Sequence, residues 1–156
     1  MKKKRKLRNS VKAVIIDDGK ILLLQKDNGK GGYTVLPGGG QEFGETLHQA
    51  LKREVFEEIG AKIKIGKLLH IREYFSEKHD YALEDREIHQ VEFFFKCKLV
   101  EAYKPKNGHF PDPHQKEVVW VSLDKLDEAN FYPTALRKIL PDLKHNDAPI
   151  YLGECN

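Results

Sequence analysis

Cysteine, methionine and tryptophan are scarce in this sequence, with two, one and one copies among 156 residues. The two cysteines, Cys97 and Cys155, form no C-x-x-C pair and have no metal-ligand spacing, which argues against a disulfide framework and a structural zinc site. Cys97 alternates with Phe93, Phe95 and Leu99, so we expect a thiol in the core. This cysteine usage favours a cytoplasmic protein.

Long apolar runs are also missing. No stretch approaches the length of a membrane span, so no membrane partner is expected. The basic start resembles the first part of a secretory signal, but Lys12 and the pair Asp17-Asp18 interrupt the apolar run that would have to follow. The length suits one domain, which we place at residues 11–156.

Charge is distributed unevenly along the chain. The formal net charge is +3, yet the first ten residues hold six basic groups and no acidic one, leaving 21 basic against 24 acidic residues in the remainder. Such a run could contact RNA, anionic lipid or polyphosphate. Its composition is more typical of a disordered tail, which we predict for residues 1–10.

One stretch, residues 39–61, combines glycines, acids and an arginine at fixed spacing. The pattern reads G-x5-E-x7-R-E-U-x-E-E-x-G-U, where U is an aliphatic residue. Its fixed positions are filled by Gly39, Glu45, Arg53, Glu54, Glu57, Glu58 and Gly60.

The same stretch predicts a helix over residues 46–59. Thr46 and Gln49 form a capping box, and Gly60 suits the left-handed residue that ends a helix. Glu54, Glu57 and Glu58 then stand at i, i+3 and i+4, which places three carboxylates on one face within reach of a common ion. Hard cations such as Mg²⁺ prefer oxygen ligands, although a solvated acidic face is the plainer interpretation of this spacing alone.

Alternating apolar segments surround this helix. Asp18-Gly19 predicts a hairpin between strands 11–16 and 21–25, and a short strand is expected at 33–36. Further strands are predicted at 63–75, 88–100 and 118–121, and prolines bracket a second helix over 134–140. The fold class is therefore α/β (α+β).

The pattern at residues 39–61 resembles the Nudix box, from which only Ala61, smaller than the usual aliphatic residue, departs. The resemblance implies a mixed β-sheet sandwiched between helices. It also implies an Mg²⁺ site, with Mn²⁺ as an alternative, that is formed by Glu54, Glu57, Glu58 and the carbonyl of Gly38. Arg53 would be an orienting residue paired with a box glutamate, and Glu45 is the expected partner.

A later glutamate is a further candidate. Glu117 precedes Val118-Val119-Trp120, and many Nudix sequences carry E-x-x-W at the start of the last core strand. By this resemblance Glu117 is an additional metal ligand or base, whereas an ordinary surface residue is the alternative. Glu54 is the preferred general base and Glu117 the reserve. Two polar loops, 76–87 and 103–115, are expected to carry specificity, and their aromatics Tyr81 and Phe110 could stack on a base.

The resemblance implies a hydrolase that cleaves the diphosphate linkage of a nucleoside diphosphate linked to a group X, either a nucleoside triphosphate or a nucleotide derivative. Three alternatives stay open. They are an RNA 5′-end pyrophosphohydrolase, an isomerase of isoprenoid diphosphates and a non-catalytic nucleotide-sensing module. The isomerase would need a catalytic cysteine, which a core Cys97 does not supply. RNA is thus a second candidate partner, and a homodimer is left open as the assembly.

Overall fold

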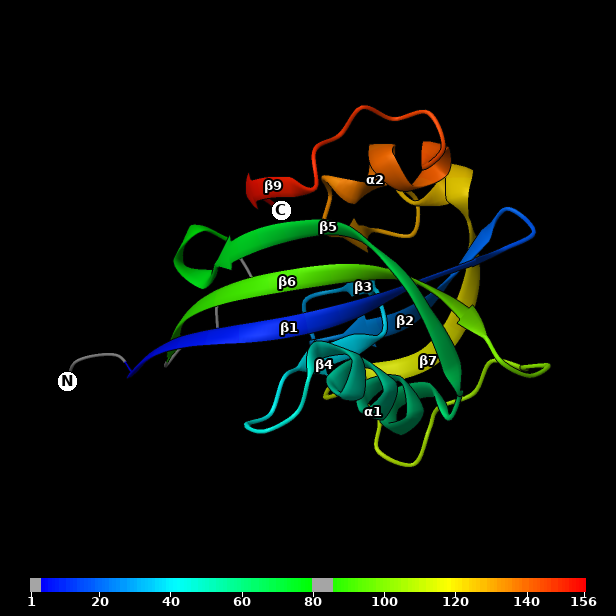
Figure 1. Ribbon diagram of the computed structural model, residues 1–156, viewed down its shortest axis with the longest axis horizontal. Helices are drawn as coiled ribbons and strands as arrows, with labels where there is room; N and C mark the ends of the chain where they lie inside the picture. The colour runs from blue at the N-terminus through cyan, green and yellow to red at the C-terminus, as the bar shows by residue number, and fades with distance from the viewer. Residues whose placement is uncertain (1–3, 80–85) are drawn as a thin grey trace.

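A computed structural model describes residues 4–79 and 86–156. Their strands form a mixed sheet in the order β8-β3-β2-β1-β6-β5-β9, with β4 beside β1 and β7 beside β2 (Figure 1). The strands are β1 (Lys4–Asp17), β2 (Lys20–Asp27), β3 (Gly32–Val35), β4 (Gly38–Gly40), β5 (Ile63–Phe75), β6 (Arg86–Leu99), β7 (Gln115–Ser122), β8 (Phe131–Tyr132) and β9 (Tyr151–Glu154). The helices are α1 (Leu47–Ile59) and α2 (Leu136–Ile139), and single 3₁₀ turns lie at Ser76–Lys78, Leu123–Lys125 and Leu140–Asp142.

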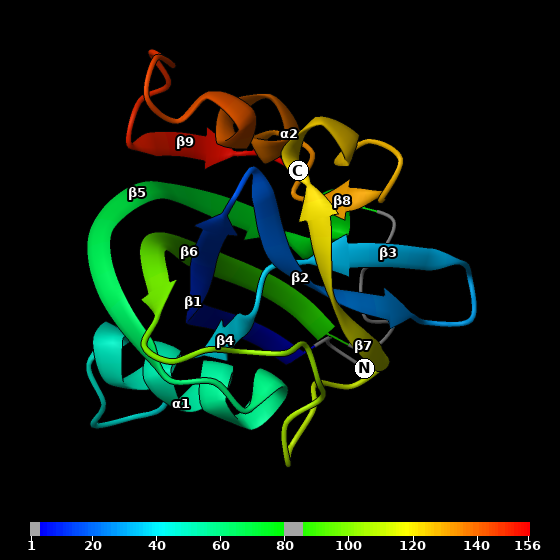
Figure 2. The ribbon, with the colours of Figure 1, turned by 90° about the vertical axis from the view of Figure 1, so that its right-hand side faces the viewer.

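Two cores lie on the two faces of this sheet, since side chains alternate along each strand. Val11 on β1 packs with Leu51 and Val55 of α1, whereas Val14 packs with Leu136 of α2. Figures 1 and 2 show α1 and α2 on opposite sides of the curled sheet. The predicted sandwich of a mixed sheet between helices is therefore confirmed.

Local signals in the sequence fix the hairpin and the long helix. Asp18 and Gly19 both have positive φ, 47° and 70°, as the tight turn between β1 and β2 requires. Thr46 and Gln49 form the expected capping box, and Gly60 ends α1 at φ 67°. The second helix is shorter than predicted, since α2 covers Leu136–Ile139 and then tightens into a 3₁₀ turn.

The prediction of a disordered tail over residues 1–10 is wrong for residues 4–10. They form the first half of β1 and pair in parallel with β6, from Lys4 opposite Arg86 onwards. Arg5 also forms an ion pair with Glu87 at 2.8 Å. The sequence hid this strand because, apart from the exposed Leu7, its residues before Ser10 are polar on both faces. Residues 1–3 and Tyr81 lie outside the described part of the chain.

Cys97 is buried, as expected, and burial raises the pKa of its thiol to about 12. Both cysteines are free. Within residues 4–79 and 86–156, no helix has the length and apolar composition that crossing a membrane requires.

Candidate active site

A turn made only of glycines brings α1 against the sheet. Strand β4, Gly38–Gly40, pairs with Ser10, Val11 and Lys12 of β1. Gly38 has φ 138°, and a Cβ there would overlap the Val11 carbonyl oxygen. A Cβ at Gly39 would lie 2.5 Å from the carboxyl carbon of Glu54. Glycine is therefore required at residue 38 for β4 to lie against β1, and Gly39 leaves room for the Glu54 carboxyl of α1.

Glu58 is the most deeply buried acid of α1, with 2% of its surface exposed. Its Oε1 accepts a hydrogen bond from the Gly38 N–H at 2.7 Å, but its Oε2 is buried without any partner. Burial raises the pKa of Glu58 to about 8; the nearby Asp112 carboxylate acts in the same direction, and the Lys12 ammonium opposes it. The unpartnered oxygen marks a place for a proton or a cation.

Arg53 connects the turn, the loop before α1 and two glutamates. It contacts both Glu45 oxygens at 2.7 and 3.1 Å, in the bidentate geometry expected from the sequence, and this pairing lowers the pKa of Glu45. It also donates to Glu54 at 2.9 Å, to Glu57 at 3.4 Å and to the carbonyl oxygen of Gly40 at 3.0 Å. The donors of Arg53 are thus all engaged by protein acceptors, which link the glycine turn to the glutamates.

The three box carboxylates line one cleft but do not all have the same hydrogen-bond partner. Among residues 4–79 and 86–156, no three acidic, histidine or cysteine side chains lie close enough to hold an ion together. The reason is local, because Arg53 holds Glu57 together with Glu54 while Glu58 turns inward to Gly38.

The donor set beside the glycine turn nevertheless suits a hard cation. Burial raises the pKa of Glu54, and the Glu54 and Glu58 carboxyls repel each other. The Gly38 carbonyl accepts a hydrogen bond from Lys12 Nζ at 3.3 Å, so a cationic group already lies at this oxygen. Mg²⁺ commonly takes one or two carboxylates and keeps several waters. Glu54, the unpartnered oxygen of Glu58 and the Gly38 carbonyl therefore fit such an ion.

The 103–115 loop is fixed to the end of α1, a contact that the sequence did not predict. The last carbonyls of the helix accept hydrogen bonds from Gly108 N (2.8 Å), Phe110 N (2.9 Å), Tyr103 Oη (2.9 Å) and Gln115 Nε2 (2.8 Å). These contacts satisfy acceptors that a helix end leaves free. The signal that could have indicated this contact is Gly108, where a Cβ would overlap the carbonyl of Glu57.

The loop and the glutamates enclose a cleft of about 270 Å³. Its lining combines residues 110–113 of the loop with Glu42, Arg53, Glu54, Glu57 and Glu58. Asp112 in this loop pairs with Lys26 of β2, which joins the cleft to the second half of the sheet. Phe110, 69% exposed, stands at the rim where an aromatic contact was expected.

Glu117 lies on β7, opposite Gln25 of β2. Val118 and Trp120 of β7 pack in the core beneath α1, whereas Val119 and Val121 pack in the core beneath α2. Glu117 shares the face of Val119 by strand alternation and is exposed.

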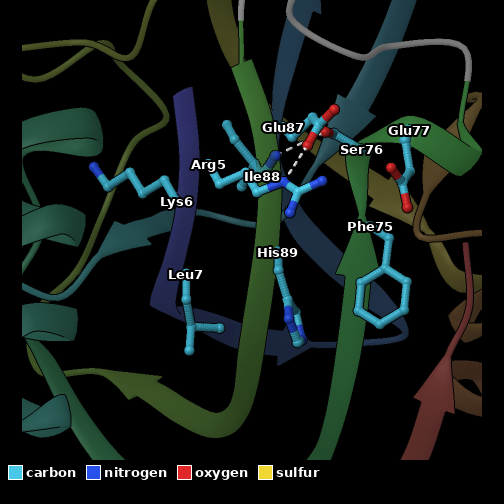
Figure 3. Close-up of a pocket in the computed structure, with 9 residues that line it drawn as sticks. All are labelled: Arg5, Lys6, Leu7, Phe75, Ser76, Glu77, Glu87, Ile88 and His89. Atoms are coloured by element: carbon cyan, nitrogen blue, oxygen red, sulfur yellow. Dashed lines mark hydrogen bonds and ion pairs between the residues drawn. The ribbon is translucent and has the colours of Figure 1, made fainter. Parts of the chain in front are cut away.

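A larger pocket of about 450 Å³ lies at the far end of β1 (Figure 3). Residues 5–7, 75–77 and 87–89 line it, and the Arg5–Glu87 ion pair crosses it. It contains none of the box residues.

Comparison with known proteins decides the family. The sequence model of the NUDIX domain matches residues 6–143. This chain belongs to the NUDIX family. It is a Nudix-type pyrophosphohydrolase, and the box residues at 39–61 lie inside the matched region.

Individual Nudix relatives are distant. Over 125 residues the chain is 29% identical to the nucleoside triphosphatase NudI of Enterobacter sp. (strain 638), an alignment that covers 77% of this chain and 85% of that protein. It is 43% identical over 63 residues to the ADP-ribose pyrophosphatase of Methanocaldococcus jannaschii, covering 40% of this chain and 37% of that one. Its fold resembles a NUDIX hydrolase from Nitrosomonas europaea with a TM-score of 0.70, at 24% identity and 88% coverage of both chains.

Proposed function

We propose that this Nudix enzyme hydrolyses the diphosphate linkage of a nucleoside diphosphate linked to a group X, with Mg²⁺ or Mn²⁺ as its metal ion. The observation that carries the proposal is the buried Oε2 of Glu58, which has no partner and lies beside Glu54 and the glycine turn. The names of two relatives, a nucleoside triphosphatase and an ADP-ribose pyrophosphatase, support this substrate class.

The chain's own residues would divide the work. Glu54, Glu58 and the Gly38 carbonyl would hold the ion, which when bound neutralises phosphate oxygens and makes a water more acidic. Arg53 keeps Glu54 oriented through its 2.9 Å contact, and the Gly38 N–H fixes Glu58. Residues 110–113 narrow the cleft and limit the entry of bulk water.

Glu54 is the proposed general base, because burial raises the pKa of its carboxyl and makes it a better proton acceptor than an exposed acid. The attacking water would give a proton to Glu54 while its oxygen bonds to phosphorus. The bond from that phosphorus to the bridging oxygen would break, and the leaving phosphate would depart opposite the entering oxygen.

A nucleotide panel tests this function. The purified protein would be assayed against nucleoside triphosphates, ADP-ribose, nucleotide sugars and 5′-triphosphorylated RNA, each with Mg²⁺, Mn²⁺ or EDTA. We expect metal-dependent cleavage of at least one small nucleotide, with ¹⁸O from labelled water in one of the phosphate products. Turnover of RNA alone would favour the pyrophosphohydrolase of RNA 5′ ends. Binding without turnover would favour a sensing module and contradict the proposal.

A further inference from the structure

The guanidinium of Arg8 on β1 has no partner among residues 4–79 and 86–156. Among the arginines whose side chains the structure describes, Arg5, Arg53, Arg72 and Arg137 each pair with a carboxylate. The Arg8 side chain makes no hydrogen bond or ion pair with the described residues, and its Nε is buried and unpartnered. Holding a half-buried guanidinium without a counter-charge is unfavourable, so a ligand that satisfies it would bind there favourably.

The position of Arg8 places this free charge beside the candidate active site. A Cβ at Gly40 would lie 2.9 Å from Arg8 Nη2 and 3.3 Å from its Cζ, so the guanidinium lies against the glycine backbone. The carbonyl oxygen of the same Gly40 accepts a hydrogen bond from Arg53 Nη2 at 3.0 Å. Gly40 thus has two guanidinium neighbours, of which Arg53 is occupied by glutamates and Arg8 is free.

Arg8 also continues a row of polar side chains. Alternation along β1 puts Arg8, Ser10 and Lys12 on one face, with neighbours roughly 6.6 Å apart along the strand. Ser10 Oγ donates to the Gly39 carbonyl at 3.1 Å, and Lys12 Nζ donates to the Gly38 carbonyl at 3.3 Å. Two cations therefore lie along the strand that pairs with the glycine turn, one near each end of that turn.

We propose that Arg8 binds a phosphate group of the substrate adjacent to the phosphorus that is attacked. A guanidinium presents paired N–H donors that match the oxygens of a phosphate, and here they face the turn that carries the reacting end. This proposal rests on the function proposed above, because it takes the bound phosphate to belong to the nucleotide that the enzyme cleaves. Anion binding by Arg8 can be measured without turnover.

The neighbouring basic residues provide a matched control. Figure 3 shows Arg5 directed to Glu87, and Lys6 extending away from the other labelled side chains. Lys6 lies two residues from Arg8 on the same strand face and is exposed. Removing its charge changes the net charge of the protein as much as removing Arg8 does, without changing the group that lies on Gly40.

The test is a calorimetric titration of inorganic pyrophosphate into the full chain, at low salt and with EDTA present. We expect the wild type to bind, Arg8→Met to bind at least about tenfold more weakly, and Lys6→Met to stay within about twofold of wild type. Equal affinity of Arg8→Met and wild type would overturn the proposal. Equal loss in Lys6→Met, or no binding by the wild type, would also overturn it.

The variant Gly40→Ala tests whether the position of the Arg8 guanidinium matters, because it changes that position and leaves the charge unchanged. The new methyl group would displace Arg8 Nη2 while leaving every charge in place. We expect weaker pyrophosphate binding, with a thermal melt showing that the variant is folded. Undiminished binding in folded Gly40→Ala would contradict the placement of the ligand on Arg8.

Turnover then distinguishes this site from the function on which it rests. With a nucleotide that the panel shows to be cleaved, Arg8→Met should raise KM more than it lowers kcat. Pyrophosphate binding that depends on Arg8, in a protein that cleaves no nucleotide, would remove the proposed function and keep the anion site. Nucleotide cleavage with an unchanged KM in Arg8→Met would keep the proposed function and remove the role of Arg8 in binding the substrate.

Discussion

Glu58 and Glu92 are two glutamates with nearly the same burial, 2% and 3% exposed, in very different surroundings. Glu92 on β6 accepts hydrogen bonds from Gln90 Nε2 at 2.6 Å and from Arg72 Nη2 at 3.3 and 3.5 Å. Glu58 on α1 has one backbone donor and one oxygen without a partner. Burial alone therefore does not determine what a carboxylate does in this protein.

The pKa shifts of the two groups have opposite signs. Burial pushes the pKa of both upward. For Glu92 the Arg72 guanidinium, the Lys12 ammonium and the Gln90 amide outweigh burial and hold the pKa below its usual range. For Glu58 burial prevails. Glu92 is stabilised as an anion by the fold, whereas Glu58 would become fully stabilised as an anion only with an added cation.

The largest effect on stability is expected from Glu92→Gln. The change leaves the buried guanidinium of Arg72 without its counter-charge, which should cost about 3–5 kcal/mol in the free energy of unfolding. Urea denaturation measures it. The matched control is Glu87→Gln, which removes an exposed partner of Arg5 and should cost less than about 1 kcal/mol. Similar losses in both variants would mean that the buried ion pair contributes no more to stability than the exposed one.

Glu58→Gln should have the opposite profile. Loss of this carboxylate should lower kcat by at least about a hundredfold, since it would remove a charged ligand of the metal ion. Metal-free stability should be retained or increased, because an amide at this position leaves no unpartnered charge. Steady-state kinetics would measure the loss of kcat, and thermal melts in EDTA would measure the metal-free stability.

Glu57→Gln is the control for that variant. The half-exposed Glu57 carboxylate is held only by a 3.4 Å contact to Arg53, so its loss should lower kcat less than the loss of Glu58 does. If Glu57→Gln proved the more damaging change, the ion would lie further out along α1 than the buried oxygen indicates.

Acidification should weaken the fold through Glu92. Because its folded pKa is lowered, its contribution is fully present above the unfolded pKa of roughly 4.3 and is lost as pH falls through the folded value. In that window the unfolded state binds more protons, so the free energy of unfolding decreases as pH falls. Urea melts at several acidic pH values should show a shallower decrease in Glu92→Gln. An identical slope in the variant would assign the acid sensitivity to other carboxylates.

The smallest effect is expected from Glu117→Gln. Its side chain is exposed and forms no ion pair with the described residues, so as an ordinary surface residue it should change stability by no more than about 0.5 kcal/mol and kcat by no more than about twofold. A large fall in kcat, partly restored by more Mg²⁺, would show that Glu117 reaches the metal site after all.

The parts of the fold that local chemistry determines could be predicted from the sequence. The caps of α1, the Asp18-Gly19 turn and the pairing of Arg53 with Glu45 depend on residues close together in the chain. Spacing could place Glu54, Glu57 and Glu58 on one face, but it could not say which of them Arg53 holds outward and which turns into the core.

Features set by distant segments were missed. The pairing of β1 from Lys4 onward depends on β6, more than 80 residues later, and no apolar alternation reveals it. The contact of the 103–115 loop with α1 uses backbone groups, which leave little trace in side-chain composition.

The long parallel ladder between β1 and β6, from Lys4 opposite Arg86 to Ile15 opposite Cys97, also bears on how the chain folds. Contacts so far apart in sequence close a large loop and form slowly. During synthesis β1 has to wait until β6 has left the ribosome, and in that interval the edge that pairs with β6 is open. Lysine and arginine along its first half discourage pairing with other chains. The same charges that resemble a disordered tail would thus protect the nascent chain from aggregation.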